Sequence, residues 1–396
     1  MWKQITRRKE VLGGKCLACV LSLGALLLSG FILPPMNMPH GVTPTAREIF
    51  HLHMFAFYIC CGIGVVVFAM MLYCLLKYRK TKGAKAVPIH SNLAVEIIWT
   101  VIPFVLLIFL AVPATRVLKD IHNTSKPDLN IKITGYQWKW RYEYLDQNIR
   151  FFSNMSTPQA QIEGAAPKDQ WYLLEVDHPL VVPIKEKIRL LVTSNDVIHD
   201  WWVPELGVKQ DAIPGYVNEN WMYIEKPGIY RGECGELCGV HHAFMPIVVK
   251  AVTRKEFAQW VAKENGSLVG SAETKPPKPM TESALVAQGK EVYARHCAAC
   301  HQASGQGMPP TFPAIKGSKI ATGPVEGHVN IILHGVAGSA MQAFSEQLDD
   351  TQIAAVVTYQ RHSWGNDAII KKKNQSQPNK GYDLTVQPAT VYKLRN

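Results

Sequence analysis

Two long apolar stretches constrain this 396-residue chain more than any other feature. Residues 50–76 contain no Asp, Glu, Lys or Arg, and residues 93–114 contain a single one, Glu96. Each stretch is long enough to cross a hydrocarbon core of about 30 Å as a helix. We therefore expect a membrane domain at residues 36–115, built as a hairpin of two transmembrane helices. Glu96 is a candidate functional residue because an ionisable group at membrane depth is costly, unless it lies at the headgroups.

A short basic loop separates the two apolar stretches. It carries five cations, which are Lys77, Arg79, Lys80, Lys82 and Lys85. Such loops remain on the cytoplasmic side of a membrane. Two spans then place everything after Thr115 outside the cytoplasm.

The first 33 residues have a composition of their own. Basic residues in the first ten positions precede an apolar run from Val11 to about Leu33. This order is typical of a signal peptide. The run is long and lacks a clear small-residue cleavage site, so an additional membrane helix is the alternative.

The overall composition excludes a disordered chain. Hydrophobic residues make up 47% and charged residues 18%, and the formal net charge is +11. A chain this apolar can bury a core. The basic excess on its own is compatible with a membrane surface, an anionic partner or nucleic acid.

The sequence pattern of residues 120–262 is typical of a β-sandwich or barrel. Apolar and polar residues alternate, or β-formers cluster, in short runs separated by Pro, Gly and Asn. We expect strands near residues 129–134, 171–176, 187–194, 221–224 and 247–252.

One loop of this β region is crowded with soft metal ligands. Cys234 and Cys238 are followed by His242 and Met245, and His199 lies at the end of an expected strand about 35 residues earlier. Thiolate, imidazole and thioether together favour copper over magnesium or calcium. A blue-copper site uses only one cysteine.

The second cysteine suggests two copper ions. If both thiolates bridge two metals, each metal still needs about two terminal ligands. His199, His242, Met245 and one backbone carbonyl would complete that set, and Glu236 between the cysteines is the nearest carbonyl.

Three alternatives remain for this loop on the residues alone. Cys234, Cys238, His242 and His199 could form a tetrahedral zinc site. The two cysteines could form a disulfide in an oxidising compartment. His241 also competes with His242 as the ligand.

The last third of the chain carries a haem signature. Residues 263–282 are rich in Ser, Lys and Pro and indicate a linker. Cys297, Cys300 and His301 then form C-x-x-C-H, the attachment motif of c-type haem. A zinc or redox C-x-x-C is the alternative. Methionine is a common second iron ligand. We expect Met341 in this role over Met308, because far more chain separates Met341 from His301.

We expect the haem region to be a small all-α domain at residues 283–365. Residues 283–299 and 346–362 have the pattern of helices. Residues 366–396 form a basic, polar tail that we expect to be mobile.

These features together resemble cytochrome c oxidase subunit II with a fused cytochrome c domain, as in bacterial caa-type oxidases. The ligands Cys234, Glu236, Cys238, His242 and Met245, with upstream His199, match the CuA pattern at each position. The resemblance implies a binuclear copper centre in a cupredoxin-like domain. It selects His242 over His241, and it adds a magnesium ion held in part by the Glu236 carboxylate at the boundary with subunit I.

The resemblance also assigns two residues outside the copper loop. Trp138 resembles the tryptophan through which electrons enter from cytochrome c. Glu96 resembles a glutamate at the mouth of a proton channel of subunit I.

The implied function is electron entry into a proton-pumping haem-copper oxidase. Electrons from an external or the fused cytochrome c would pass through CuA to subunit I, which holds haem a and CuB and reduces oxygen. The expected setting is a bacterial inner membrane, with both cofactor domains on the periplasmic side. Expected partners are the other oxidase subunits, a cytochrome c donor and the lipid bilayer, and not nucleic acid.

Two departures from the family pattern bear on electron entry. The fused haem domain leaves open whether Trp138 serves the tethered haem, an external donor or both. The net basic charge also predicts a weaker acidic docking patch than other members use.

Overall fold

The computed structural model describes residues 37–85, 91–270, 277–336, 339–378 and 380–395. Residues Gly41–Asn396 pack as one unit. The expected signal peptide at residues 1–33 lies outside the described residues.

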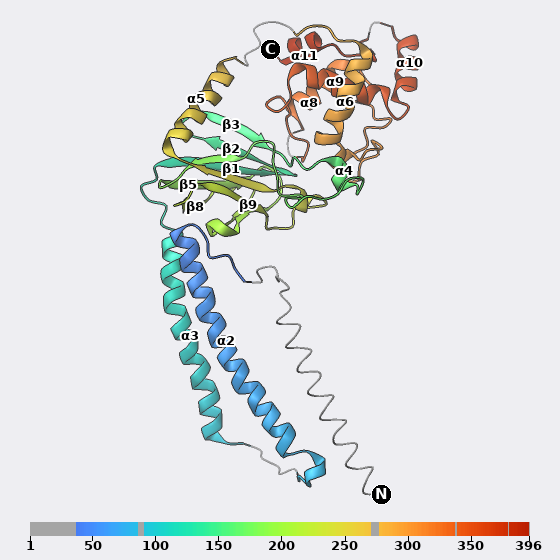
Figure 1. Cartoon of the computed structure of the whole chain (residues 1–396). Coiled ribbons are helices and arrows are strands. Elements are labelled where there is room, and N and C mark those ends of the chain that lie inside the picture. The colour runs from blue at the N-terminus through green and yellow to red at the C-terminus, as the bar shows by residue number, and fades with distance from the viewer. Residues whose placement is uncertain (1–36, 86–90, 271–276, 337–338, 379, 396) are drawn as a thin grey trace. The chain divides into compact units, whose positions relative to one another are not determined.

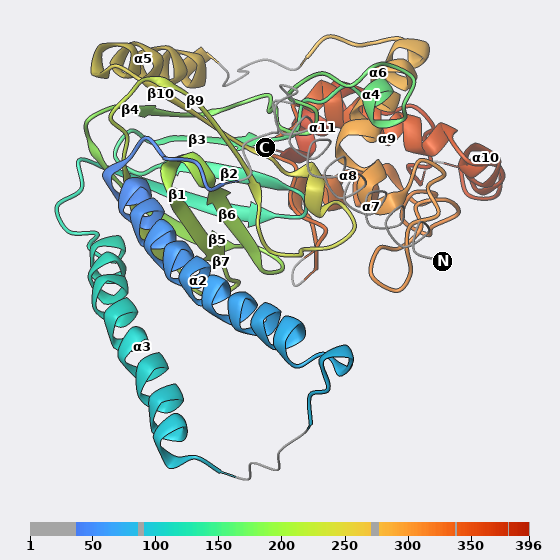
Figure 2. The same ribbon diagram turned by 60° about the horizontal axis from the view of Figure 1, so that its bottom comes forward.

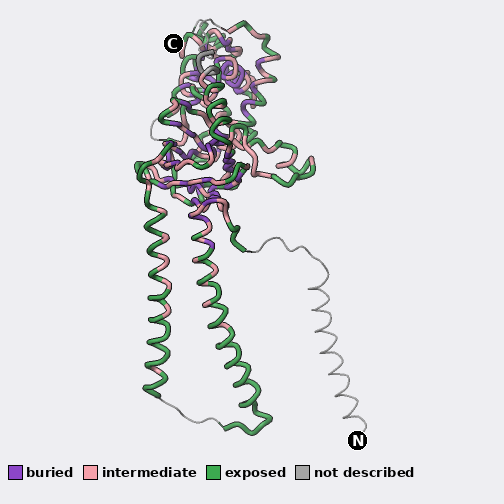
Figure 3. The backbone as a smooth tube through the Cα atoms, turned by 60° about the vertical axis from the view of Figure 1, so that its left-hand side comes forward, coloured by how far each residue is buried: buried purple, intermediate pink, exposed green. Residues whose placement is uncertain are grey.

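Two long helices form the expected membrane hairpin (Figure 1). Helix α2 spans Pro44–Lys77, helix α3 spans Leu93–Ile121, and the 3-10 turn η1 (Lys80–Lys82) lies between them. Both helices are long and apolar enough to cross a membrane. They are exposed along most of their length, whereas buried residues gather in the rest of the chain (Figure 3). This distribution is what lipid-facing helices require.

The first turn of α2 is packed into the β domain. The Thr43 hydroxyl accepts a hydrogen bond from the Ala46 amide at 3.0 Å and caps the helix. Ala46 is 4% exposed, because Gly207 approaches it so closely that a Cβ there would meet its Cα at 2.7 Å. Arg47 pairs with Glu225 at 2.7 Å. The membrane hairpin is therefore fixed to the β domain by buried contacts as well as by the chain.

Ten strands form two five-stranded sheets that pack as a sandwich (Figure 2). One sheet has the order β3-β2-β1-β5-β8 and the other β4-β10-β9-β6-β7, with parallel pairs only at β1–β5 and β4–β10. The strands are β1 (Leu129–Tyr136), β2 (Lys139–Tyr144), β3 (Ile149–Ser153), β4 (Leu180–Pro183), β5 (Lys187–Ser194), β6 (His199–Val203), β7 (Val208–Ala212), β8 (Asn218–Tyr223), β9 (Gly228–Cys234) and β10 (Ile247–Val252). Short helices α4 (Gln159–Ile162), η2 (Pro204–Leu206) and η3 (His242–Phe244) lie in the connections.

The alternation of buried and partly exposed residues along the strands shows where the core of the sandwich lies. Along β5, Ile188, Leu190 and Val192 are buried while the residues between them are partly exposed. Fully buried Trp140 and Trp201 join the two sheets in one apolar cluster. The alternation predicted for residues 187–194 is therefore confirmed.

The expected strand at residues 171–176 was wrong. Only Val176 makes a bridge, to Met155, and Leu173 adopts a positive φ of 61°. The side chain of Trp171 instead packs under the Arg231 guanidinium, 3.6 Å from the ring centroid. Residues 171–176 form a loop, and their apolar pattern alone does not distinguish such a loop from a strand.

Helix α5 (Arg254–Gly270) follows the last strand and covers the edge of the sandwich near β3 and β4. Phe257, Trp260 and Val261 repeat at helical spacing and pack on the sandwich core. The first part of the expected linker at residues 263–282 is thus helical, because the apolar stripe that starts the helix lies just before it.

The carboxy-terminal domain is helical, as expected. It comprises α6 (Glu282–His296), α7 (Ala298–His301), α8 (Val325–His334), α9 (Asp350–His362), α10 (Asn366–Ser376) and α11 (Pro388–Arg395). Helices α6 and α9 form its central pair. A capping box at Asp349 and Gln352 begins α9.

The tail at residues 366–396 is part of this fold instead of a mobile extension. Val386 and Val391 are 1% and 0% exposed within the helical core. Buried Arg361 donates to the carbonyls of Ala321, Gly323 and Asp383. The basic composition of the tail concealed these few buried apolar positions.

Candidate metal centre and cofactor cavity

The structure brings the predicted copper ligands together at one end of the sandwich. His199 begins β6 and Cys234 ends β9, so two neighbouring strands hold the first pair. Cys238 follows in the loop, and His242 and Met245 lie at and just after η3. The side chains of these five ligands are almost fully buried, except that of His242, which is partly exposed. The loop therefore closes over the ends of the two strands.

Cys238 is the centre of the cluster. Its Sγ lies 3.8 Å from Cys234 Sγ, 3.5 Å from His242 Nδ1 and 3.5 Å from Met245 Sδ. The carbonyl oxygen of Glu236 lies 3.4 Å from Cys234 Sγ. Two sulfurs at this separation are unbonded, and both cysteines are free. A thioether and a carbonyl beside two thiols suit copper better than the zinc alternative, which would leave Met245 unused.

His199 is oriented by a carboxylate. Its Nδ1 lies 3.9 Å from Cys234 Sγ, while Nε2 lies 2.8 Å from Asp196 Oδ1. A hydrogen bond from Nε2–H to Asp196 fixes the tautomer that leaves Nδ1 free for a metal. The ring rests against Gly135 of β1, where a Cβ would come within 2.8 Å of His199 Cδ2.

The paired thiols favour one thiolate in the metal-free site. The Cys238 thiol donates to Cys234 and, with help from His199, lowers the pKa of Cys234. The same hydrogen bond raises the pKa of Cys238. Binding a metal would release the remaining proton, since the thiolate is the ligand form.

The turn between β1 and β2 holds the cysteine loop from outside. The Cys238 carbonyl accepts hydrogen bonds from Gln137 Nε2 at 2.9 Å and from the indole N–H of Trp138 at 3.2 Å. Trp140 Nε1 donates to the Met245 carbonyl at 3.2 Å. Side chains at and after this turn therefore hold the ligand loop by hydrogen bonds to its backbone carbonyls.

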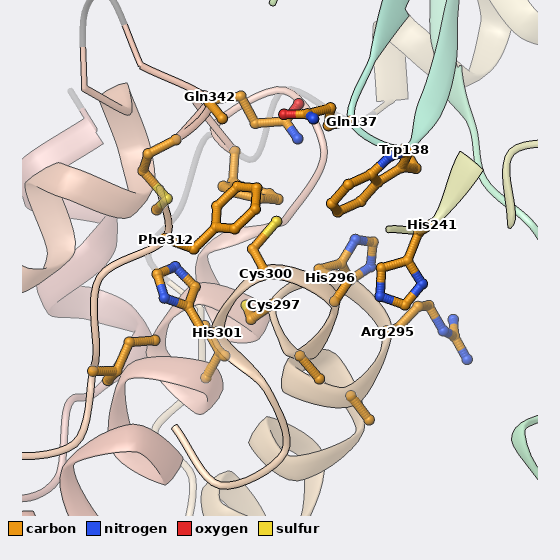
Figure 4. Close-up of a pocket in the computed structure, with 18 of the residues that line it drawn as sticks. Gln137, Trp138, His241, Arg295, His296, Cys297, Cys300, His301, Phe312 and Gln342 are labelled. Carbon is orange, nitrogen blue, oxygen red and sulfur yellow. The ribbon is translucent and has the colours of Figure 1, made fainter. Parts of the chain in front are cut away.

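A cavity of about 1000 Å³ contains the predicted haem motif (Figure 4). Cys297, Cys300, His301 and Met341 all line it, and Met308 is not among its lining residues. Its volume suits a large organic cofactor. Burial raises the pKa of Cys297 to about 12 and that of Cys300 to about 11, so both remain thiols, the form that adds to a vinyl group.

The hydrogen bond and the burial of His301 suit the role of an iron ligand. Its Nδ1 lies 2.8 Å from the Pro313 carbonyl, to which Nδ1–H donates. Burial lowers the pKa of His301, which favours the neutral ring. Nε2 is then the nitrogen available to a metal.

A buried polar pair lies at the cavity wall. His328 and Gln360 line the cavity, with His328 Nε2 2.7 Å from Gln360 Oε1. His328 Nδ1 has no hydrogen-bond partner within the described part of the chain, although the side chain is 4% exposed. Because Nε2–H donates to Gln360, Nδ1 is an acceptor, which a hydrogen-bond donor in the cavity would satisfy.

Trp138 contacts both sites. Besides its hydrogen bond to the cysteine loop, Trp138 lies near Phe312, which lines the cavity next to Pro313. The centroids of the two rings are 6.0 Å apart. The ring centroid of His241 lies 5.0 Å from that of Trp138. The His241 ring lies outside the sulfur cluster and instead packs against the rings of Trp138 and Phe244. Figure 4 shows Trp138 and His241 beside His296 and Cys300.

Glu96 lies in neither site. It occupies the first turn of α3, where its Oε1 accepts a hydrogen bond from the Asn92 amide at 3.3 Å. The hairpin thus places it in the membrane domain. Here its carboxylate has a capping role as well as any role in proton transfer.

Sequence reasoning missed the groups that orient the ligands. Asp196 could have been found, since it lies three residues before His199. The Pro313 carbonyl and the close approach of Gly135 carry no sequence signal, because both depend on which segments meet in the fold.

Replacing Gly135 with alanine should weaken copper binding. The new Cβ would displace the His199 ring from its position beside Cys234. We expect a loss of copper affinity of about 10- to 100-fold, the usual effect of disturbing a ligand's support. A competition titration of the full chain with a copper chelator measures it. Gly327→Ala, where no atom lies within 4 Å of the added Cβ, is the control and should bind copper normally.

Three family models match the chain. Residues 129–252 match the periplasmic domain of cytochrome c oxidase subunit II, and residues 34–117 match its transmembrane domain. Residues 284–359 match the model described as cytochrome c oxidase, cbb3-type, subunit III. The first two cover the hairpin and the sandwich, and the third covers most of the helical domain.

Relatives over the first two domains are numerous. A Rickettsia bellii protein named "Probable cytochrome c oxidase subunit 2" is 38% identical over 61% of this chain and 91% of its own length. The mitochondrial cytochrome c oxidase subunit 2 of Glycine max is 39% identical over 58% of this chain and 59% of its own. The crystal structure of the periplasmic domain of subunit II (CoxB) of Bradyrhizobium japonicum is 46% identical and covers 36% of this chain and 98% of its own, with a TM-score of 0.33.

The ligand loop, the membrane hairpin and the sandwich thus agree with the family models, and the cavity agrees with a cytochrome c domain. The chain belongs to the cytochrome c oxidase subunit II family and carries a carboxy-terminal cytochrome c domain.

Proposed function

We propose that this chain takes electrons from cytochrome c and delivers them through CuA to subunit I of a proton-pumping haem-copper oxidase, where oxygen is reduced to water. The observation that carries the proposal is the position of Trp138. Its indole N–H is bonded to the carbonyl of Cys238 in the copper loop, and its ring faces Phe312 at the haem cavity.

The chain supplies one site for each carrier. When bound, two copper ions and a covalent haem c provide one-electron redox centres in the two domains. The residues that would hold the copper ions are Cys234, Cys238, His199, His242, Met245 and, through its carbonyl, Glu236. The buried, hydrogen-bonded setting of these residues holds them in place, so little reorganisation is needed when the charge changes.

Cys297 and Cys300 would hold the haem covalently, and His301 and Met341 would bind its iron. His301 is supported by its bond to Pro313, and Met341 packs against the helical core while lining the same cavity. Phe312 and Trp138 lie between this cavity and the copper loop, which supports Trp138 as the entry point for the tethered haem.

The remaining roles concern subunit I. The Glu236 carboxylate is exposed in the cysteine loop, which leaves it available to a magnesium ion shared with that subunit. Glu96 would take up protons at the cytoplasmic end of the hairpin. An additional donor, a soluble cytochrome c, would reduce the chain on the periplasmic side of a bacterial inner membrane.

The copper assignment is tested by a matched histidine pair. We expect the full chain, loaded with copper, to give an electron paramagnetic resonance spectrum in which one unpaired electron is shared by two copper nuclei. His242→Ala should abolish that spectrum, because the ring nitrogen lies next to Cys238 Sγ. His241→Ala should retain it, since that ring faces Trp138. A spectrum of a single copper in the unaltered chain would overturn the assignment.

The haem assignment is tested by a matched methionine pair. Met341→Leu should remove the sulfur ligand and lower the haem reduction potential, because a thioether raises it. Met308→Leu should leave the potential and the absorption spectrum unchanged, since Met308 does not line the cavity. A redox titration of both variants decides between them, and the reverse result would assign Met308.

The role of Glu96 is tested in the assembled oxidase. Glu96→Gln keeps an oxygen that can accept from the Asn92 amide, so the start of α3 should be retained. We expect oxygen consumption to fall several-fold while reduction of the copper centre proceeds at the normal rate. Glu48→Gln, an exposed glutamate in α2, is the control. Normal turnover of Glu96→Gln would exclude a role in proton uptake.

A further inference from the structure

The sandwich presents a basic strip to the helical domain. The strip consists of Lys139 and Arg141 on β2 and Arg150 on β3, together with the ring of Phe152. Opposite it lies the acceptor loop, residues 344–347 of the helical domain, which contributes Phe344, Glu346 and Gln347. The two surfaces come from parts of the chain about 200 residues apart.

Lys139 is the buried centre of this contact. The residue is 5% exposed, and its Nζ donates a hydrogen bond to Gln347 Oε1. The ring centroids of Phe152 and Phe344 lie 5.1 Å and 4.9 Å from Lys139 Nζ. A buried cation is costly unless it is compensated. The cation–π contacts and the hydrogen bond offset part of this cost, while burial lowers the pKa of Lys139 to about 7. Two of these three contacts, with Phe344 and Gln347, come from the helical domain.

Glu346 joins two arginines across the same boundary. Its Oε2 lies 3.0 Å from Arg141 Nη2, and its Oε1 lies 3.3 Å from Arg150 Nη2. Each arginine therefore takes one oxygen of the carboxylate. These side chains are partly exposed, so the pairs contribute more to orientation than to affinity.

The opposite charges of this contact are divided between the two domains. Here the cations lie on the sandwich and the carboxylate on the haem domain. A basic external protein would be repelled by Arg141 and Arg150, whereas the acceptor loop is complementary to them.

The acceptor loop is also the segment that carries a proposed iron ligand. Met341 lies three residues before Phe344 and five before Glu346. The second contact between the domains, Phe312 with Trp138, comes from the loop that supports His301. The segments on both sides of the proposed haem therefore touch the sandwich, and two separated contacts define an orientation.

We propose that Lys139, Arg141 and Arg150 form a docking surface for the chain's own haem domain, which binds through Glu346 and Gln347 and covers Trp138. This inference deepens the proposed function and rests on it. The docked domain takes the position that an external donor would need. External cytochromes then reduce the tethered haem and do not contact Trp138 directly.

Docking itself can be measured without any redox step. In the full chain, Arg150→Lys provides an amine next to the Glu346 carboxylate, because Arg150 is the more exposed of the two arginines. A zero-length carbodiimide should join the introduced lysine to Glu346, as peptide mass spectrometry would detect. The additional change Glu346→Gln removes the carboxylate and should abolish that cross-link. Absence of the cross-link in Arg150→Lys would overturn the proposal.

The functional consequence is measured in the assembled oxidase by rapid photoreduction of the haem. We expect Glu346→Arg to slow electron transfer from haem to copper by about tenfold or more, because three cations then meet. Adding Arg141→Glu should restore part of the rate by re-forming one pair in the opposite sense. The control is Glu326→Arg, an equal charge change at an exposed position on α8, which should have no effect.

The outcomes separate docking from electron transfer. Haem content and the copper spectrum should be unchanged in every variant, because none of these residues is a ligand. A cross-link with no haem-to-copper transfer would leave the docking surface in place and refute the electron path. An unaltered rate in Glu346→Arg would show that this surface does not position the haem domain.

Discussion

The carbonyl of Cys238 connects the main parts of this molecule. It accepts hydrogen bonds from Gln137 and Trp138, so the metal loop is fixed to the β1–β2 turn. Trp138 meets the helical domain at Phe312, and the next residue, Lys139, is enclosed by Phe344 and Gln347. One backbone oxygen thus links the position of the copper ligands to the position of the haem cavity.

The two cofactor sites are built on the same physical plan. In each, a histidine has one ring nitrogen committed to an oxygen acceptor, Asp196 for His199 and Pro313 for His301. The other nitrogen is left for a metal. Such support restricts the ligand before the metal arrives and holds it as the charge changes. Electron carriers benefit from this because small rearrangements keep the cost of transfer low.

Joining a haem domain to a subunit II chain changes what the donor-binding surface of the sandwich must provide. A free donor must associate and leave, and charge steering then sets its rate. A tethered donor is held at a high local concentration, so weak contacts are enough to orient it. The partly exposed Glu346 pairs and the buried Lys139 fit that requirement. The apolar hairpin, anchored through Ala46 and Arg47, fixes the whole assembly to the bilayer.

The sequence by itself determined the features that depend on short spacing. These are the membrane hairpin, the spacing of the proposed copper ligands, the C-x-x-C-H motif and most strands and helices. It misjudged residues 171–176 and the tail after residue 365, because burial there depends on distant partners such as Arg231 and Arg361. Only the tertiary structure placed Gly135 against His199 and Lys139 between the domains. Those contacts join segments far apart in the chain, and no local pattern encodes which segments will meet.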